Sequence, residues 1–241
     1  MNKYVLITGA SGGIGAAVAR QMASQGYHLF LHYNQNRQSV IQLKEELKSE
    51  ERDVKLVQAD LGSQCGADYL ITQLSHPVAS IIHNSGSSYV GLLQDMGDDE
   101  VETMIQLNLT SPIQLTKKLL PQMIQARSGK IIVISSIWGL AGASCEVVYS
   151  TVKGGLNSFV KALAKEVAPS GIQVNAVAPG AISTSMLDHF SGEDLQAISE
   201  EIPMGRLGHP EEVANLVSFL HSNQAEYING QVISVNGAWH C

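Results

Sequence analysis

Tyr149 and Lys153 lie four residues apart in the segment E-V-V-Y-S-T-V-K-G-G, residues 146–155. In a helix this spacing makes the two side chains neighbours on one face. An ammonium held near a phenol favours the phenolate, so Lys153 is expected to lower the tyrosine pKa from about 10 toward neutrality. The pair would then supply a proton to a carbonyl oxygen. The alternative is packing alone, with a half-buried Tyr149 and a solvated Lys153.

A glycine-rich turn follows the first predicted strand. The segment T-G-A-S-G-G-I-G, residues 8–15, comes directly after an apolar run and leads into an alanine-rich helix. Gly9, Gly13 and Gly15 would let the backbone approach a diphosphate, whose charge the N–H groups and dipole of the new helix would meet. An ordinary tight turn is the alternative. The strand before the turn and the helix after it favour dinucleotide binding.

The end of the second predicted strand bears on which dinucleotide is bound. Residues 28–37 read H-L-F-L-H-Y-N-Q-N-R and contain no acidic residue. An acidic side chain there would bind the 2′-hydroxyl of an NAD ribose and would repel a 2′-phosphate. Its absence, together with Arg37, favours NADPH, although Gly12 offers no basic side chain to add to the argument. Arg37 as a solvated helix start is the alternative.

Ser136 and Asn108 complete the candidate catalytic set. Ser136 follows the predicted strand 130–135, at the carboxyl end where open parallel sheets bind ligands. Asn108, in Q-L-N-L-T, lies in an apolar helical stretch where an amide is costly unless it is hydrogen-bonded. Taken alone, the serine fits a turn and the asparagine fits a satisfied core amide. Together with Tyr149 and Lys153 on a dinucleotide scaffold, they indicate one catalytic site.

The elements that must position these residues alternate between short apolar runs and longer helical stretches. The predicted strands are residues 4–8, 28–33, 54–59, 80–83, 130–135, 173–178 and 231–235. The predicted helices are residues 14–25, 39–50, 115–125, 147–168 and 210–220. The strands are continuous apolar runs, as expected where both sheet faces are covered. The alternation predicts an α/β fold with a doubly wound, seven-stranded parallel sheet of the Rossmann type, in a single domain over residues 1–241.

Composition excludes several classes of protein. The chain has 241 residues and a net charge of −7, which argues against a nucleic-acid partner. No apolar run reaches the roughly 20 residues of a membrane span. The start M-N-K-Y-V-L-I-T-G is expected to enter a strand at once, so no signal peptide is expected. Three cysteines without C-x-x-C spacing fit reduced thiols in a cytoplasm, and the eight histidines show no metal-ligand spacing.

Further motifs join those above. H-N-S-G stands at residues 83–86 and A-P-G at residues 178–180. With the glycine turn and Y-x-x-x-K, they resemble the short-chain dehydrogenase/reductase family. M-G-R-L-G-H-P-E-E-V-A at residues 204–214 and Y-I-N-G-Q-V-I-S-V-N-G at residues 227–237 are similar to its 3-oxoacyl-(acyl-carrier-protein) reductase group. The resemblance runs from residue 3 to about residue 238.

The resemblance implies an NADPH-dependent ketone reductase, assembled as a homotetramer. Tyr149 would be the general acid, and Lys153 would bind the nicotinamide ribose and tune the tyrosine. Ser136 would orient the carbonyl, and Asn108 would anchor a water chain that resupplies the proton. The implied cofactor-binding residues are Gly9, Ser11, Gly12, Gly13, Ile14, Gly15, Asn34, Arg37, Asp60, Leu61, Asn84, Ser85, Gly86, Tyr149, Lys153, Pro179, Gly180, Ile182 and Thr184.

Basic residues bear on the substrate, which is expected to be a small ketone or a ketone on an acyl group or a protein. Carrier-protein reductases generally present two arginines to the acidic carrier. Arg127 matches one of them, but residues 169–171 read P-S-G where the second belongs. Losing a charge pair weakens the docking of a partner without changing the chemistry. The resemblance favours a 3-oxoacyl thioester, and the runner-up is a 5-aminopentanone group on a lysine of elongation factor P, the substrate of a similar group in bacilli.

Two other classes of function remain for comparison. A non-catalytic NADPH-binding protein would be expected to lack Tyr149 or Lys153, and both are present. A serine hydrolase would use Ser136 as its nucleophile, but no G-x-S-x-G segment surrounds it. The walls of the substrate site are expected in the loops near residues 88–95 and 183–205.

Overall fold

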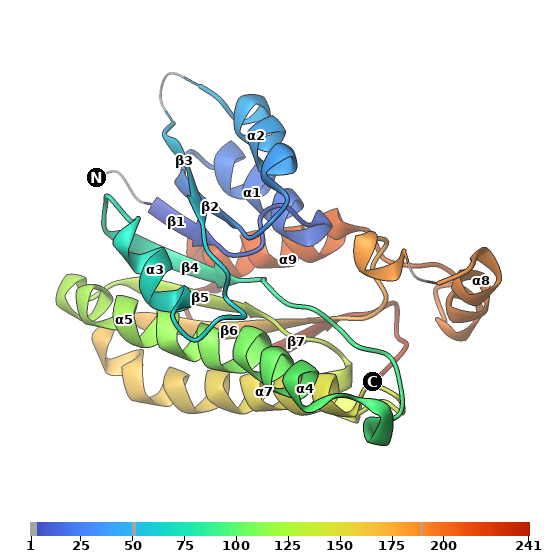
Figure 1. The fold of residues 1–241 in the computed structure, drawn as a ribbon. Coiled ribbons are helices and arrows are strands. Elements are labelled where there is room, and N and C mark those ends of the chain that lie inside the picture. The colour runs from blue at the N-terminus through green and yellow to red at the C-terminus, as the bar shows by residue number, and fades with distance from the viewer. Residues whose placement is uncertain (1–3, 50–51, 189) are drawn as a thin grey trace.

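One sheet carries the candidate site. Within residues 4–49, 52–188 and 190–241, which the computed structural model describes, seven parallel strands lie in the order β3-β2-β1-β4-β5-β6-β7 (Figure 1). The strands are β1 (Tyr4–Ile7), β2 (His28–Tyr33), β3 (Val54–Gln58), β4 (Val78–His83), β5 (Gly129–Ile134), β6 (Ile172–Pro179) and β7 (Val232–Val235). The chain runs outward from β1 to β3 and then returns to add β4 on the other side of β1. Ligands bind such sheets at the carboxyl ends of the strands where the order reverses.

Helices cover both faces of the sheet (Figure 1). One layer consists of α1 (Gly13–Ser24), α2 (Arg37–Glu46) and α9 (Pro210–His221). The opposite layer consists of α3 (Gly66–Thr72), α5 (Ser111–Ala126) and α7 (Val147–Val167), with α4 (Asp98–Ile105) against α7. Two further helices are α6 (Trp138–Ala141) and α8 (Gly192–Glu201), and α8 projects from the body (Figure 1).

Short helical turns complete the chain between these elements. A π-helical turn, η2 (Gln106–Thr110), joins α4 to α5. The 3-10 turns are η1 (Leu93–Asp95), η3 (Ala168–Ser170), η4 (Ser185–Leu187) and η5 (Asn223–Ala225).

The central strands of the sheet bury both of their faces. Val5 and Ile7 of β1 belong to one apolar core, which α1, α2 and α9 share. Leu6 belongs to a second core on the opposite face, which α3, α5 and α7 share. Successive side chains of a strand point to opposite faces, so a strand buried on both sides must be apolar throughout. This explains the continuous apolar runs in the sequence.

The predicted fold class is confirmed: the chain forms a doubly wound, seven-stranded parallel sheet of the Rossmann type in one domain. Each predicted strand is present, with ends that shift by at most two residues. The predicted helix 39–50 is shorter, because it ends at Glu46 with Leu47 as its cap, and residue 50 lies outside the described residues. The predicted helix 115–125 begins earlier, at Ser111.

Four helices, α3, α4, α6 and α8, were not among the helix ranges predicted from the sequence. Helix α3 has seven residues and begins at a glycine that packs against the Asp60 backbone. Helices α4 and α8 have one buried residue and none, respectively, so they lack a broad apolar face. Short helices that bury little leave a weak periodic signal in a sequence.

Surface features bear on the remaining expectations. Ile113 and Ile124 of α5 and Val147 of α7 are exposed apolar side chains, which fits the predicted homotetramer, and that assembly stays a prediction. Among the described residues, none of the helices combines the length and apolar character needed to cross a membrane. The same part of the chain contains no group of three or more His, Cys, Asp or Glu side chains placed to hold a metal ion.

Candidate active site

The four predicted catalytic residues lie at the carboxyl ends of the central strands. Tyr149 and Lys153 come from the first two turns of α7, and Ser136 follows directly after the end of β5. Asn108 comes from the π-helical turn η2. All four side chains are buried. The structure therefore gathers residues that the sequence separates by up to 45 positions.

The Tyr149 hydroxyl lies close to the hydroxyl of Ser136, and this contact acts to lower the tyrosine pKa. Ser136 is fixed in turn, because its oxygen accepts the backbone N–H of Trp138 at 3.2 Å. The two hydroxyls lie where a carbonyl oxygen can be met by two donors at once. This is the geometry that a general acid and an orienting residue require.

Lys153 is held behind the tyrosine. Its Nζ donates to the backbone oxygen of Ile134 at 3.0 Å and lies 5.5 Å from the centroid of the Tyr149 ring. Burial lowers the pKa of Lys153 to about 8. Gly139 allows α6 to approach, since an added Cβ there would stand 2.7 Å from the Lys153 carbonyl carbon. The lysine is thus a fixed part of the site and not a solvated surface residue.

The expected lowering of the Tyr149 pKa is not found in this structure. Burial raises the pKa of Tyr149 to about 12, and the charge of Glu146 adds to the rise while the contact with Ser136 opposes it. Removal of the phenol from water outweighs Lys153, whose own charged form burial disfavours. The protein alone therefore keeps the phenol protonated, ready to act as a donor.

Asn108 is placed by the break between α4 and α5. Its Nδ2 donates to the backbone oxygens of Met104 at 3.1 Å and Ser87 at 3.2 Å. Its Oδ1 is buried and accepts no hydrogen bond from the described residues. A Cβ added to Gly86 would stand 2.6 Å from this oxygen and 3.5 Å from Lys153 Nζ. The amide oxygen and the ammonium thus converge on Gly86, and a π-helical turn commonly marks such a functional position.

The glycine turn and the end of β4 are joined by hydrogen bonds. The hydroxyl of Thr8 accepts the backbone N–H groups of Asn84 at 2.9 Å and Ser85 at 3.0 Å. Asn84 Nδ2 donates to the backbone oxygen of Gly9 at 3.0 Å. Gly9 has a φ of +66°, and a Cβ on Gly15 would stand 2.3 Å from the Gly9 oxygen. Larger side chains would fill this turn, so the glycines are required by its shape.

The segment after β6 closes over the same turn. A Cβ added to Gly13 would stand 2.8 Å from Thr184 Cγ2, so these two residues are in close approach. Ile182 is buried and forms an isolated bridge with Gly208. The Pro179 oxygen accepts the backbone N–H of Ile137 at 3.0 Å. Thr184, predicted from a distant motif, thus faces the amino end of α1, where Gly12 is the N-cap and no acidic residue stands in the first turn.

The ends of β2 and β3 lie on the other side of the turn. Asp60 Oδ1 accepts the side chain of Asn34 at 3.2 Å and the backbone N–H of Gly62 at 2.9 Å. Leu61 is buried. Arg37 is the exposed first residue of α2, the position that the sequence offered as an alternative to phosphate binding. This placement after the end of β2 is compatible with 2′-phosphate binding and with a solvated helix start.

Three residues of the site were not identified from the sequence. Thr8 bridges β1 to the end of β4, as described above. Asn157 accepts the Ser135 hydroxyl at 2.6 Å and donates to the Gly139 oxygen at 2.9 Å, which fixes α7 to β5 and α6. Its spacing of four residues from Lys153 was the available signal. The third, His32, is a buried polar residue inside an apolar strand.

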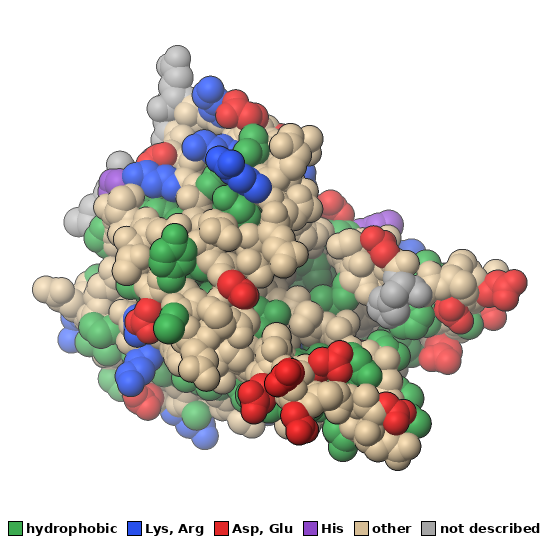
Figure 2. Space-filling model, viewed as in Figure 1, with side chains coloured by type: hydrophobic (Ala, Val, Ile, Leu, Met, Phe, Trp, Pro, Cys, Tyr) green, Lys and Arg blue, Asp and Glu red, His purple; other side chains and the backbone are tan. Residues whose placement is uncertain are grey.

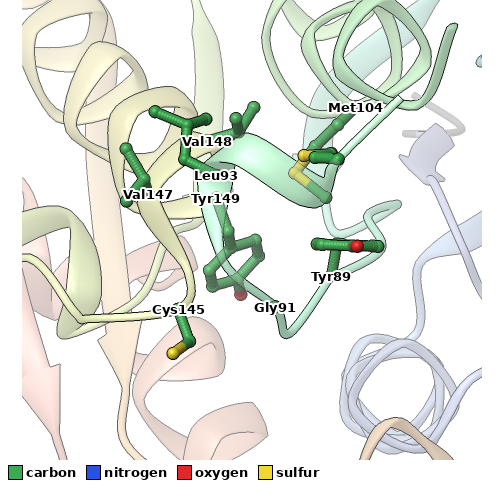
Figure 3. Close-up of a pocket in the computed structure, with 9 residues that line it drawn as sticks. Tyr89, Gly91, Leu93, Met104, Cys145, Val147, Val148 and Tyr149 are labelled. Carbon is green, nitrogen blue, oxygen red and sulfur yellow. The ribbon is translucent and has the colours of Figure 1, made fainter. Parts of the chain in front are cut away.

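An apolar pocket adjoins the tyrosine (Figure 3). Figure 3 shows the side chains of Tyr89 and Met104 on one side, those of Val147 and Val148 on the other, and the Tyr149 ring between them. Further lining residues are Gly91, Leu93, Met96 and Cys145. The first of the two segments expected to form the substrate walls, residues 88–95, therefore lines a pocket beside Tyr149.

Acidic side chains surround this end of the molecule. They gather over η1 and α4 and again on the projecting α8 (Figure 2). No lysine or arginine occurs between Lys55 and Lys117 or between Lys165 and Arg206. The acidic residues of these two helical segments are Asp95, Asp98, Asp99, Glu100, Glu102, Glu193, Asp194, Glu200 and Glu201.

Comparison with known proteins identifies the family. A family model described as Enoyl-(Acyl carrier protein) reductase matches residues 9–240. The chain belongs to the short-chain dehydrogenase/reductase family. It is therefore an oxidoreductase of that family, as the resemblance of its motifs predicted.

Individual members of the short-chain dehydrogenase/reductase family match over nearly all of the chain. It is 51% identical over 242 residues to "Uncharacterized oxidoreductase YmfI" of Bacillus subtilis (strain 168), covering 100% of both chains. It is 35% identical over 243 residues to 3-oxoacyl-[acyl-carrier-protein] reductase FabG of Staphylococcus aureus (strain Mu50 / ATCC 700699), covering 100% of this chain and 99% of the relative. A crystal structure of 3-oxoacyl-[acyl-carrier protein] reductase from Brucella melitensis ATCC 23457 has a TM-score of 0.91 at 29% identity, covering 99% of this chain and 92% of that one.

Proposed function

We propose that this protein is an NADPH-dependent ketone reductase in which Tyr149 is the general acid. One observation carries the proposal. The Tyr149 and Ser136 hydroxyls lie close to each other next to an apolar pocket, with the buried Lys153 behind them. A donor pair in this position can bind and protonate the oxygen of a ketone.

The glycine turn has the shape that a dinucleotide needs. A Cβ on Gly15 would collide with the Gly9 oxygen, and α1 begins at this point without an acidic residue in its first turn. The free N–H groups of a helix start can hold a diphosphate in such a cradle. Gly9, Gly13 and Thr184 would enclose it, and Asp60 and Leu61 would flank the adenine. NADPH, when bound, would supply the hydride.

The residues of this chain would supply position and a proton. Ser136 would hold the ketone oxygen, and Tyr149 would donate its proton to that oxygen as the carbon is reduced. Lys153 would bear a positive charge beside the tyrosine and stabilise the phenolate that remains. Asn108 Oδ1, which converges with Lys153 on Gly86, would anchor the water through which the proton is replaced.

The choice of NADPH over NADH rests on the end of β2. No acidic residue lies between His28 and Arg37, so nothing in this segment repels a 2′-phosphate. Arg37 stands exposed at the start of α2, where its charge can reach such a group. Asn34 offers a hydrogen-bond donor next to it, although in the structure it donates to Asp60.

The preferred substrate is a 3-oxoacyl thioester or a similar ketone. The names of the relatives support this choice, since two of those described act on 3-oxoacyl groups. Met96, Met104 and Val148 give the pocket an apolar lining, but the space enclosed is only about 10 Å³, so the surrounding loops would have to open to admit an acyl chain. A panel of ketones with NADPH, followed by the absorbance of the reduced nicotinamide, tests the proposal. Acetoacetyl thioesters should be reduced, and failure of every ketone would exclude it.

The acidic surface favours a second candidate substrate. The segments η1, α4 and α8 carry nine carboxylates and no lysine or arginine, which would repel an acidic carrier and attract a basic partner. A ketone that bears an amine and is carried on a protein fits this field, as in the 5-aminopentanone group on a lysine of elongation factor P. Including that modified protein in the same panel distinguishes the two candidates by their rates at low salt.

A further inference from the structure

His32 occupies an unusual position at the end of β2. It is the fifth of the six residues of β2, H-L-F-L-H-Y, and 2% of its surface is exposed. A buried polar side chain is costly unless its hydrogen bonds are made. The neighbours of this imidazole are therefore the first clue to its role.

Both ring nitrogens of His32 have partners in the predicted cofactor site. Nδ1 accepts the backbone N–H of Gly9 at 3.1 Å, and the Ser85 hydroxyl lies 3.3 Å from the same nitrogen. Nε2 lies 3.0 Å from the backbone oxygen of Ala59, the residue before Asp60. The His32 backbone oxygen accepts the N–H of Ala10 at 2.8 Å. One side chain thus ties together the carboxyl ends of β1, β2, β3 and β4.

These partners determine the state of the ring. A carbonyl oxygen accepts only, so Nε2 must carry the proton that points at Ala59. A backbone N–H donates only, so Nδ1 must be the unprotonated nitrogen that faces Gly9. The imidazole is therefore neutral. Burial, which lowers the pKa of His32 to about 4, agrees with this assignment.

We propose that His32 is a positioning residue for the cofactor: it fixes the Gly9 backbone and the Ser85 segment in the geometry that receives the dinucleotide. It does not touch the cofactor itself, because it is buried beneath the turn. Gly9 begins the turn at a φ of +66°, and the hydrogen bond from its N–H holds that conformation. This inference rests on the proposed binding of NADPH and adds a residue to it.

The test compares His32→Leu, His32→Gln and the wild type. The control is His221→Gln, which changes another buried histidine, one whose Nε2 lies 2.9 Å from the Ser80 hydroxyl in the amino half of β4. NADPH binding is measured directly by nicotinamide fluorescence, without a ketone, well below each melting temperature. Turnover with the best ketone is then measured at saturating NADPH.

His32→Leu is expected to raise the Kd for NADPH at least about tenfold, which corresponds to about 1.4 kcal/mol, with turnover at saturating NADPH within about twofold. His32→Gln, which keeps an acceptor and a donor, should lose less affinity than His32→Leu, and His221→Gln should keep the wild-type Kd. A His32→Leu variant that melts earlier but binds NADPH like the wild type would overturn the inference. If His32→Leu does not fold, His32→Gln decides by the same two measurements. A wild type that binds no NADPH would instead overturn the proposed function, together with the inference that depends on it.

Discussion

The two sides of the candidate active site are built differently. On the cofactor side, Thr8, Gly9, His32 and Asn84 are linked by backbone and side-chain hydrogen bonds of 2.9 to 3.1 Å. On the substrate side, the segments after β4 and β6 present exposed apolar residues, with Leu92 and Leu93 each 53% exposed and Met204 63% exposed. A site held by mutual hydrogen bonds tolerates few residue types, whereas a site lined by loops tolerates many. The sequence of the first side therefore predicts the class of the proposed cofactor, whereas the sequence of the second side does not predict the substrate.

The largest expected effect concerns the point where the two sides meet. Tyr149→Phe removes the hydroxyl alone, so folding and NADPH affinity should change little. Turnover should fall by at least about 100-fold, the range that a positioned proton donor supplies. Initial rates at saturating NADPH and ketone, together with NADPH fluorescence, check both parts. A variant that keeps most of its activity would show that Tyr149 is a packing residue.

The next test contrasts glycines from the two sides. A Cβ on Gly15 would stand 2.3 Å from the Gly9 oxygen, whereas a Cβ on Gly192, at the start of α8, meets nothing within 4 Å. Gly15→Ala should therefore raise the Kd for NADPH at least about tenfold or unfold the turn. Gly192→Ala should bind NADPH like the wild type. Equal binding by both variants would contradict the idea that one side is rigid and the other is open.

Much of the cofactor side could be predicted from the sequence, because its geometry admits few residue types at each position. Gly9, Gly13 and Gly15 leave a spaced signal because only glycine fits their backbone, and Tyr149 and Lys153 do so because a helix face fixes their spacing. His32 and Thr8 left none and Asn157 left only its four-residue spacing from Lys153, since the partners of all three lie on other strands and helices, 18 to 77 positions away in the chain. The raised pKa of Tyr149 was also out of reach, because it depends on burial that only the folded chain defines. On the substrate side, residues 88–95 were expected to line the pocket, but α4 and α8 buried too little to be predicted as helices.

Buried histidines on the cofactor side predict a pH dependence of stability. Burial lowers the pKa of His32 to about 4 and that of His83 to about 3, against about 6.5 in an unfolded chain. Between pH 6.5 and these values the unfolded chain binds more protons, so stability is fully present above pH 6.5 and is lost as the pH falls. Each histidine contributes about 1.4 kcal/mol per pH unit in its window. Urea unfolding at pH 7, 6 and 5 should show a shallower slope for His32→Gln than for the wild type, and an unchanged slope would refute the assignment.

Cofactor choice provides a smaller test of the same side. Arg37→Glu places a carboxylate at the exposed start of α2, where the proposal has a 2′-phosphate. The wild type should prefer NADPH, and the variant should narrow or reverse that preference, because like charges repel. The ratio of kcat/KM with NADPH to kcat/KM with NADH measures this preference. Lys44→Glu, a charge reversal on the same helix two turns further along, is the control. Equal efficiency of the wild type with NADPH and NADH would sink the proposed specificity.

The smallest expected effect concerns how a substrate is delivered to the open side. Arg127 is exposed, and its guanidinium donates to the backbone oxygen of Pro169 at 3.2 Å, which places it beside Ser170. One exposed charge contributes under about 1 kcal/mol to docking, and the acidic residues of η1 and α4 oppose an acidic carrier. Carrier-linked 3-oxoacyl groups should therefore be reduced no better than the same groups on a small thioester.

Ser170→Arg should improve use of the carrier-linked form by a few-fold at low salt, because one more exposed charge has an effect of that order. The gain should fade as salt screens the added charge. A wild type that strongly favours the carrier-linked form would mean that this chain binds a carrier through contacts other than Arg127, despite its acidic surface. The substrate side would then be more specialised for one partner than its exposed, acidic surface indicates.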